Sequence, residues 1–170
     1  EPGRRARQAA PGRDLHGLGE TAISSVVALG RLPALVSLWL IALWIDRLNP
    51  IRWYGTGVVL TGLMVVGLGC APSTWLAIAG YFSYCLCYGI VWGTNVAAIN
   101  SAVPVRLRDA AFALMMVFST SALFLVGFLH NRLLAGGLSL PATFRWCGLA
   151  GATGGLVLLV YSFAKWGRSD

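Results

Sequence analysis

The side chain best placed to do chemistry in this sequence is Arg31, a cation inside a long apolar run. It lies about nine residues into the run at 22–45, with Gly30 and Pro33 beside it. A charge at that depth in a membrane costs at least about 2.5–3.5 kcal/mol, so it usually faces a bundle interior or a watery cavity. Three interpretations remain open: contact with a substrate anion or coupling ion, snorkelling to the outer interface, and a structural pair with a carboxylate. Glu20 precedes it by over 15 Å of helix at about 1.5 Å per residue, so a carboxylate partner would come from elsewhere.

Other reactive residue types do not form recognisable sites. No Asp or Glu lies inside an apolar run, Asp109 standing at the first position of one, so paired-carboxylate catalysis has no candidates, and no phosphate-cradling glycine motif occurs. His16 and His130 lie in the N-terminal tail and near the end of a run. The cysteines lie in or at the ends of apolar runs, where we expect buried apolar residues rather than thiolate ligands. We therefore predict no enzyme, no cofactor and no metal site. The cysteines are Cys70, Cys85, Cys87 and Cys147.

Composition indicates the environment of the chain. Hydrophobic residues make up 57% and charged residues 11%, with mean hydropathy +0.72. A soluble domain carries about 25% charged residues, so this chain has too few to cover a globule, and we predict an integral membrane protein with the lipid bilayer as partner. The net charge of +7 is compatible with nucleic-acid binding. However, basic residues that bind nucleic acid cluster on a solvated face. Here nearly all lie in the tail or at the edges of apolar runs, so no nucleic-acid partner is expected.

Five segments are long and apolar enough to cross a membrane, which takes about 20 residues. Pro, Gly, Asn or Ser punctuates each break between them. Backbone groups in lipid must be satisfied within the segment, so the spans are predicted to be helices. The expected fold class is all-α, a polytopic transmembrane helix bundle at 17–166. It lies between a disordered basic tail at 1–16 and a short basic C-terminal tail at 167–170. The predicted spans are 22–45, 53–71, 75–99, 109–133 and 143–164.

Basic residues also indicate orientation. The loops at 46–52 and 100–109, with the C-terminus, carry six Lys or Arg, and the opposite side also carries six, four of them in the N-terminal tail. Without that tail the count favours the 46–52 side as cytoplasmic. We expect a multi-pass cell-membrane protein, in the inner membrane if the source is bacterial.

Polarity differs between the spans. Spans 53–71 and 143–164 are rich in glycine and poor in polar side chains, so they are predicted to face lipid, with Gly151 and Gly155 suited to close helix contact. The other three spans carry more hydroxyl and amide groups and are candidates to line a polar interior. Most of these groups would equally serve to hold helices together. The candidate pathway residues, besides Arg31, are Tyr84, Tyr88, Asn95 and Asn100.

The segment ALWIDRLNPIR resembles the short cytoplasmic loop motif of the major facilitator superfamily. Asp46 and Arg47 match the motif, and Arg52 supplies its trailing positive charge. Ala42 and Asn49 stand where the family has glycine, as in its commonly degenerate second copy. The segment at 100–133 resembles the connection between the family's tenth and eleventh helices, with matches at Pro104, Arg108 and Ala110-Ala111. Residues 17–31 resemble the extracellular turn before its eighth helix.

This resemblance implies a secondary active transporter that moves a small molecule by alternating access. The five spans would be helices eight to twelve; a rival register makes them helices two to six. Helices nine and twelve, which face lipid in the family, would then be the two glycine-rich spans. The gating loop would comprise Asp46, Arg47, Arg52 and Arg108. Arg31 would favour an anionic substrate.

Alternating access needs two halves, so the partner would be a missing N-terminal half and the fragment should be inactive alone. The alternatives are a non-transporting membrane scaffold or assembly subunit, and the remnant of a truncated gene.

Overall fold

The computed structural model describes residues 20–47 and 49–166, and every regular element in these ranges is helical. The tails predicted at 1–16 and 167–170 lie outside the described residues. The elements are α1 (Glu20–Leu29), α2 (Arg31–Trp44), the short 3-10 helix η1 (Ile45–Arg47), α3 (Pro50–Cys70), α4 (Thr74–Ala102), the 3-10 helix η2 (Val105–Leu107), α5 (Arg108–Ala135) and α6 (Leu140–Trp166).

The five predicted spans are confirmed as helices long and apolar enough to cross a membrane. The first span is Thr21–Trp44 and combines α1 with α2, and the others correspond to α3, to α4, to α5 with η2, and to α6. The boundaries differ by up to four residues, most at the start of the span Val105–Ala135, followed by the starts of α3 and α6 and the end of α4. The chain is therefore an all-helical bundle of the kind that membranes accommodate.

Capping groups explain where the helices begin. The Asn49 side chain accepts a hydrogen bond from the Arg52 amide (3.2 Å), and Pro50 fills the first helical position, where no amide donor is needed. Ser73 caps α4 through the Leu76 amide (3.4 Å). The sequence signals interpreted as turns are thus also helix starts, which is why α3 begins three residues before the predicted span.

The first span departs from regular helix at a single residue near its middle, Gly30, whose backbone keeps helical dihedral angles. α1 ends at Leu29 and α2 begins at Arg31, although the Gly30 amide still donates to the Val26 carbonyl (2.9 Å). Pro33 has no amide hydrogen, so it cannot donate to the Leu29 carbonyl as a helical residue at that position would. Gly30 also lies against the Tyr81 ring of α4, which leaves no room for a side chain. This departure leaves Arg31 about 15 Å along the helix from Thr21, roughly half of a bilayer's hydrocarbon thickness.

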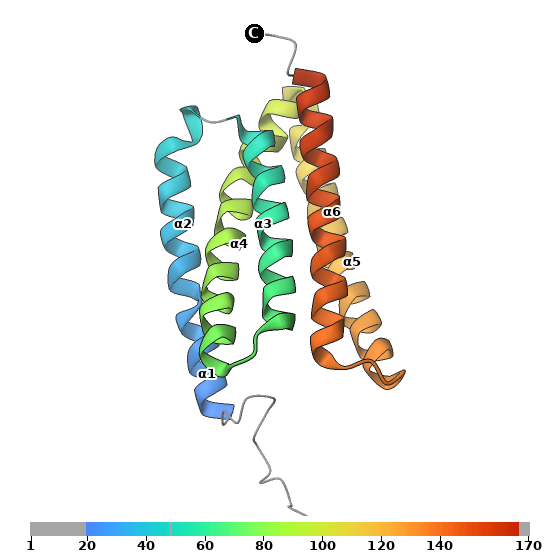
Figure 1. Ribbon diagram of the computed structural model, residues 1–170. Helices are drawn as coiled ribbons and strands as arrows, with labels where there is room; N and C mark the ends of the chain where they lie inside the picture. Colours follow the sequence, from blue (N-terminus) through green and yellow to red (C-terminus); the bar gives the residue numbers. More distant parts are fainter. Residues whose placement is uncertain (1–19, 48, 167–170) are drawn as a thin grey trace, which may run out of the picture.

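The helices are arranged around α4 and α3 (Figure 1). α4 packs between α2 and α3, and α3 packs between α4 and α6. α5 contacts α4 and α6 only sparsely. α2 and α4 run in the same direction, whereas α3 and α6 run in opposite directions. The bundle therefore has a tightly packed part, formed by α2, α3, α4 and α6, and one loosely attached helix.

Glycines on α3 and α6 form the closest helix contact, which we call the glycine seam. Its members recur every seven residues on each helix: Gly55, Gly62 and Gly69 on α3, and Gly148 and Gly155 on α6. A seven-residue repeat keeps one line of a helix facing a partner that crosses it with a left-handed twist.

The fit along the seam is close. A Cβ at Gly62 would lie 2.7 Å from the Gly148 carbonyl oxygen, and one at Gly155 would lie 2.7 Å from the Val59 amide nitrogen. The predicted Gly151–Gly155 pair is thus half involved, because Gly151 has only an ordinary contact with Gly62. The glycine-rich faces of these two helices meet each other, which leaves only their other faces to lipid.

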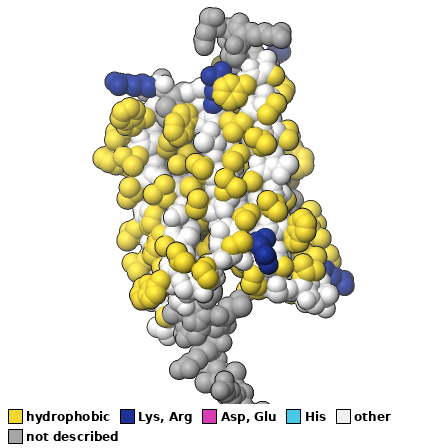
Figure 2. Space-filling model, in the orientation of Figure 1, with side chains coloured by type: hydrophobic (Ala, Val, Ile, Leu, Met, Phe, Trp, Pro, Cys, Tyr) yellow, Lys and Arg dark blue, Asp and Glu magenta, His cyan; other side chains and the backbone are white. Residues whose placement is uncertain are grey.

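Most large apolar side chains lie on the outside of this bundle. On the face shown in Figure 2, hydrophobic side chains cover the middle and basic ones lie toward the two ends. Buried apolar residues are few among those described, and they are small or medium in size: Ile41, Cys85, Cys87 and Ala98. An apolar surface with a small-residue interior fits a hydrocarbon surrounding rather than water.

Candidate functional site

Four aromatic side chains of α4 form a continuous row, which we call the aromatic ladder: Tyr81, Tyr84, Tyr88 and Trp92. Their spacing of three or four residues puts them on one face of the helix. The ring centroids of Tyr84 and Tyr88 are 5.8 Å apart and the planes are nearly parallel, at 18°. Tyr88 and Trp92 meet edge to face, at 6.2 Å and 71°. The ladder gives α4 a stiff aromatic face in the part of the bundle that crosses the membrane.

Arg31 lines a groove between α2 and α4, which we call the Arg31 groove. Its volume is about 330 Å³. The floor of the groove is set by close approach of the two helices, since Gly89 of α4 lies directly against the Ser37 side chain and the Ala34 carbonyl of α2. Ser37 donates its hydroxyl hydrogen to that same carbonyl (2.9 Å), so it needs no partner in the groove. The lining residues are Arg31, Ala34, Leu35, Leu38, Tyr88, Gly89 and Trp92.

The guanidinium of Arg31 is the charged group of this groove. The side chain is exposed, and Tyr88 and Trp92 line the groove with it. The side chains of Glu20 and Asp46 lie outside the described residues. Asp109 is the one acidic residue whose side chain is described, and it stands in the first turn of α5, at the end of the bundle away from α1. Among the described side chains, no carboxylate therefore pairs with Arg31. The arrangement provides a membrane-depth cation beside aromatic rings, which is suited to hold an anion.

A second hollow, the central groove, lies between α3, α4, α5 and α6 and has a volume of about 430 Å³. Its walls are largely apolar, and its threonine hydroxyls are satisfied by their own helices. Thr61 donates to the Gly57 carbonyl (2.7 Å) and Thr143 to the Ser139 carbonyl (3.2 Å). Tyr88 belongs to both grooves, and Tyr84 to this one. The ladder therefore forms a wall shared by the two hollows.

The structure brings together only part of the predicted pathway. Arg31 and Tyr88 share a groove, and Tyr84 stacks on Tyr88. Asn95 is half-buried farther along α4 and lines neither groove. Asn100 follows Tyr88 by twelve residues, about 18 Å along the helix. Its carbonyl accepts a hydrogen bond from the Arg108 guanidinium (2.7 Å), so Asn100 belongs to the end of α4.

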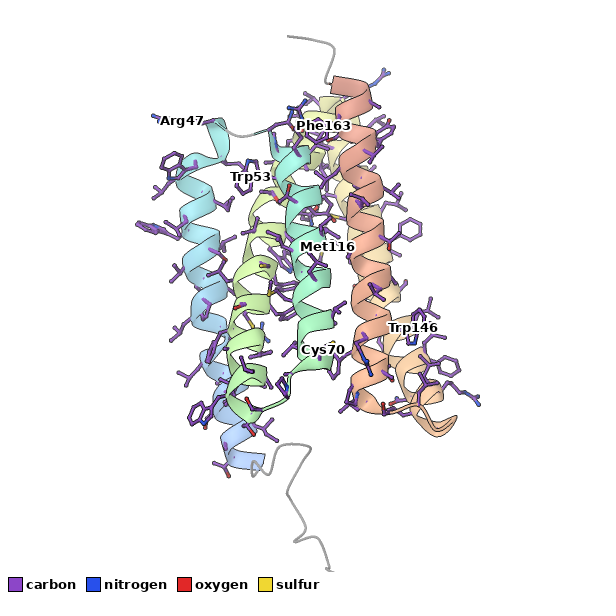
Figure 3. The ribbon with its side chains drawn as sticks, viewed as in Figure 1. Arg47, Trp53, Cys70, Met116, Trp146 and Phe163 are labelled. Atoms are coloured by element: carbon purple, nitrogen blue, oxygen red, sulfur yellow. The ribbon has the colours of Figure 1, made fainter. Side chains whose placement is uncertain are left out.

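The predicted gating residues lie together at one end of the bundle. Arg47 ends η1 and is exposed; the side chain of Asp46 lies outside the described residues. The Arg52 guanidinium stands 4.5 Å from the ring centroid of Phe163, so it joins the start of α3 to α6. Figure 3 shows Phe163 at the same end as Arg47 and Trp53.

Arg108 serves as a helix cap rather than as a contact between distant helices. Besides Asn100, it donates to the Val103 carbonyl (3.3 Å), which satisfies carbonyls at the C-terminal end of α4.

Sequence reasoning missed Trp92 and Gly89 as parts of the Arg31 groove. Trp92 had a readable signal, because it follows Tyr88 by four residues and continues the spacing of the tyrosines. Gly89 had none, since its role depends on which helix α2 packs against.

The cysteines divide into two groups. Cys85 and Cys87 are buried, as predicted, whereas Cys70 and Cys147 are exposed, and Cys147 lines the central groove. All four are free thiols. Within the described residues no group of three or more His, Cys, Asp or Glu side chains is placed to hold a metal ion.

Comparison with known proteins identifies no relative of this chain. No protein-family model, no curated protein and no solved structure matches the chain. The resemblance to the major facilitator superfamily therefore stays a prediction that rests on the quoted motifs.

Proposed function

We propose that this chain is the C-terminal part, helices eight to twelve, of a secondary active transporter of the major facilitator type that moves a small anionic molecule. The observation that carries this proposal is the position of Arg31. It is a cation near the middle of a membrane span, and it faces a groove in which no described carboxylate side chain neutralises it.

A cation at that depth is costly, and a protein keeps it where it meets a counter-charge or water. Transporters commonly bind substrate where a membrane helix is interrupted near the midplane. The departure from regular helix at Gly30 lies directly beside Arg31. An anion passing through the groove would supply the missing counter-charge, and the aromatic rings of Tyr88 and Trp92 would provide a surface for its apolar part.

The packing separates a close helix pair from the helices around the Arg31 groove. The glycine seam joins α3 and α6 closely. By contrast, α2 carries Arg31, α4 carries the aromatic ladder, and α5 is packed most sparsely. Alternating access requires such a stiff part and parts that move against a second half. In this proposal the second half is the N-terminal half of the transporter, and the chain alone does not transport.

The arginines at the ends support an orientation. Arg47, Arg52, Arg106 and Arg108 lie at one end of the described bundle, and Arg132 and Arg145 lie at the other. By the excess of positive charge, the first end would be cytoplasmic. The Arg52–Phe163 contact lies at that end, where it would form when the two helix ends approach in one state of the cycle.

One observation favours the scaffold alternative. No residue in the most apolar stretch of the span containing α5 is buried, and large apolar side chains are exposed along much of that helix. A helix so little covered by its own chain is available to a second membrane protein. Under this alternative the chain would copurify with a partner helix bundle and would carry no solute.

Reconstituted transport by the complete coding sequence tests the proposal. We expect the region upstream of Glu1 to encode seven further spans and the whole protein to take up a radiolabelled organic anion into proteoliposomes. Arg31→Gln should abolish uptake, whereas Arg145→Gln, at an end of the bundle, should leave it intact. Unchanged uptake in Arg31→Gln, or the absence of upstream spans together with no flux, would contradict the proposal.

A further inference from the structure

The Arg31 groove has aromatic and apolar walls in addition to its charged group. Two of its walls are aromatic, Tyr88 and Trp92, and both side chains are partly exposed, at 37% and 46%. Tyr84 stacks on Tyr88, whereas Trp92 meets Tyr88 edge to face at 71°, so no other ring of the ladder stacks on Trp92. The remaining walls, Ala34, Leu35 and Leu38, are apolar.

These features constrain a ligand more than charge alone. The guanidinium presents donors in a planar fork, which matches the two oxygens of a carboxylate. The apolar and aromatic walls exclude a second charge on the ligand, because nothing described in the groove would pair with it. Apolar groups alone would tolerate any hydrocarbon body, whereas aromatic faces favour a flat one.

We propose that the Arg31 groove binds aromatic monocarboxylates, with the carboxylate on the Arg31 guanidinium and the flat ring against Trp92 and Tyr88. The proposal rests on the proposed function for its biological use, but the binding itself is a property of this chain. The groove volume of about 330 Å³ falls at the lower end of the range for small-molecule sites, which is about 300–1,000 Å³. A ligand with one or two fused rings is therefore the expected size.

Three probes separate charge from ring. Radiolabelled 2-naphthoate carries both features, 2-naphthamide removes the charge, and decahydro-2-naphthoate removes the flat ring. We expect saturable binding of 2-naphthoate to the chain in phosphatidylcholine nanodiscs. The amide should bind about ten- to hundred-fold more weakly, because it loses the charge-assisted hydrogen bonds. The saturated acid should bind several-fold more weakly, because it loses aromatic contact.

Matched variants assign the two effects to residues. Arg31→Gln should reduce 2-naphthoate binding to the level of the amide, while Arg31→Lys should retain part of it because the charge remains. Trp92→Leu should remove the preference for the aromatic over the saturated acid and keep the preference for the acid over the amide. Trp39→Leu is the control, because Trp39 lies on α2, is 64% exposed and does not line the groove. A thermal melt of each variant distinguishes lost binding from lost folding.

Two other outcomes would overturn the proposal. Arg31 would instead hold a lipid headgroup if phosphatidylglycerol in the nanodiscs displaced 2-naphthoate from the unaltered chain and crosslinked to the groove. Binding that is equal for all three probes, or that Arg31→Gln leaves unchanged, would show that the groove has no such selectivity. Failure here is distinguishable from failure of the transport proposal. The complete protein would still carry some other solute if only the ligand class is wrong, and would bind without flux if only transport is wrong.

Discussion

Replacing Gly62 by alanine tests whether the glycine seam holds the bundle together. The added Cβ would lie 2.7 Å from the Gly148 carbonyl oxygen and 2.9 Å from the Ala152 Cα, and closer still to the Ala152 amide nitrogen. Favourable carbon contacts have separations of about 3.5–4.0 Å. Since the obstructing atoms are backbone, no side-chain rotation relieves the overlap, and α3 and α6 must move apart by roughly 1 Å at this level.

The expected magnitude follows from a matched comparison. Overpacking of this kind destabilises by about 1–3 kcal/mol. Alanine also favours a helix over glycine by roughly 0.5–1 kcal/mol, which partly hides that cost. Gly67→Ala provides the correction, because Gly67 lies on the same helix and a Cβ there would meet nothing within 4 Å. The difference between the two variants should therefore equal the overpacking cost, or about 2–12 °C in Tm at about 2–4 °C per kcal/mol.

The chain's own thiols provide the assay. Cys85 and Cys87 are buried, so a thiol-reactive dye would report their exposure as the bundle melts in detergent, once Cys70 and Cys147 have been changed to serine. Gly62→Ala should melt below the unaltered chain, and Gly67→Ala should melt at or above it. Equal melting temperatures for the two variants would refute the conclusion that the seam is a close backbone contact.

Three further predictions concern the ends and the interior of the bundle. Asn49→Ala should lower stability by about 1 kcal/mol through loss of the α3 cap, and Asn49→Ser should restore most of it in thermal melts. A double-mutant cycle with Arg52→Ala and Phe163→Leu should give a coupling energy of about 0.5–1 kcal/mol, and a value near zero would contradict the contact between the Arg52 guanidinium and the Phe163 ring. In the folded chain, a membrane-permeant maleimide should modify Cys147 much faster than Cys85, and comparable rates by mass spectrometry would contradict the burial of Cys85.

The helical spans were predictable because one physical requirement fixes them. A bilayer demands about 20 apolar residues per span and internal hydrogen bonding, so hydropathy and Pro or Gly punctuation locate the helices within a few residues. The predicted helix starts are displaced where a polar side chain accepts a hydrogen bond from an amide in the first turn of the helix. Asn49 begins α3 earlier than hydropathy indicates, and Ser73 begins α4. Hydropathy has no term for such caps.

Helix pairing was less accessible to sequence, because it depends on which faces meet. The five glycines of α3 indicated close contact with another helix, and the small number of polar side chains in α3 indicated contact with lipid. The close contact is confirmed for the face of α3 that meets α6, and lipid contact stays a prediction for its other faces. The seven-residue spacing indicates which face of α3 meets another helix, because Gly55, Gly62 and Gly69 share this period with Gly148 and Gly155 on α6. Two crossing helices require a common period, whereas contact with lipid requires none.

The candidate site shows the same limit in another form. Arg31 stood out because a charge in an apolar run is improbable, and the tyrosines stood out because they are polar. Trp92 and Gly89 did not, since each is ordinary in a membrane helix until α2 is placed beside α4. A membrane site is thus marked in sequence by the residues that are costly in lipid. The residues that shape the site cost little free energy in lipid, so only the packing of the helices identifies them. Selectivity for the shape of a ligand in the Arg31 groove should accordingly be altered by changes at Trp92 and Gly89, which hydropathy does not single out.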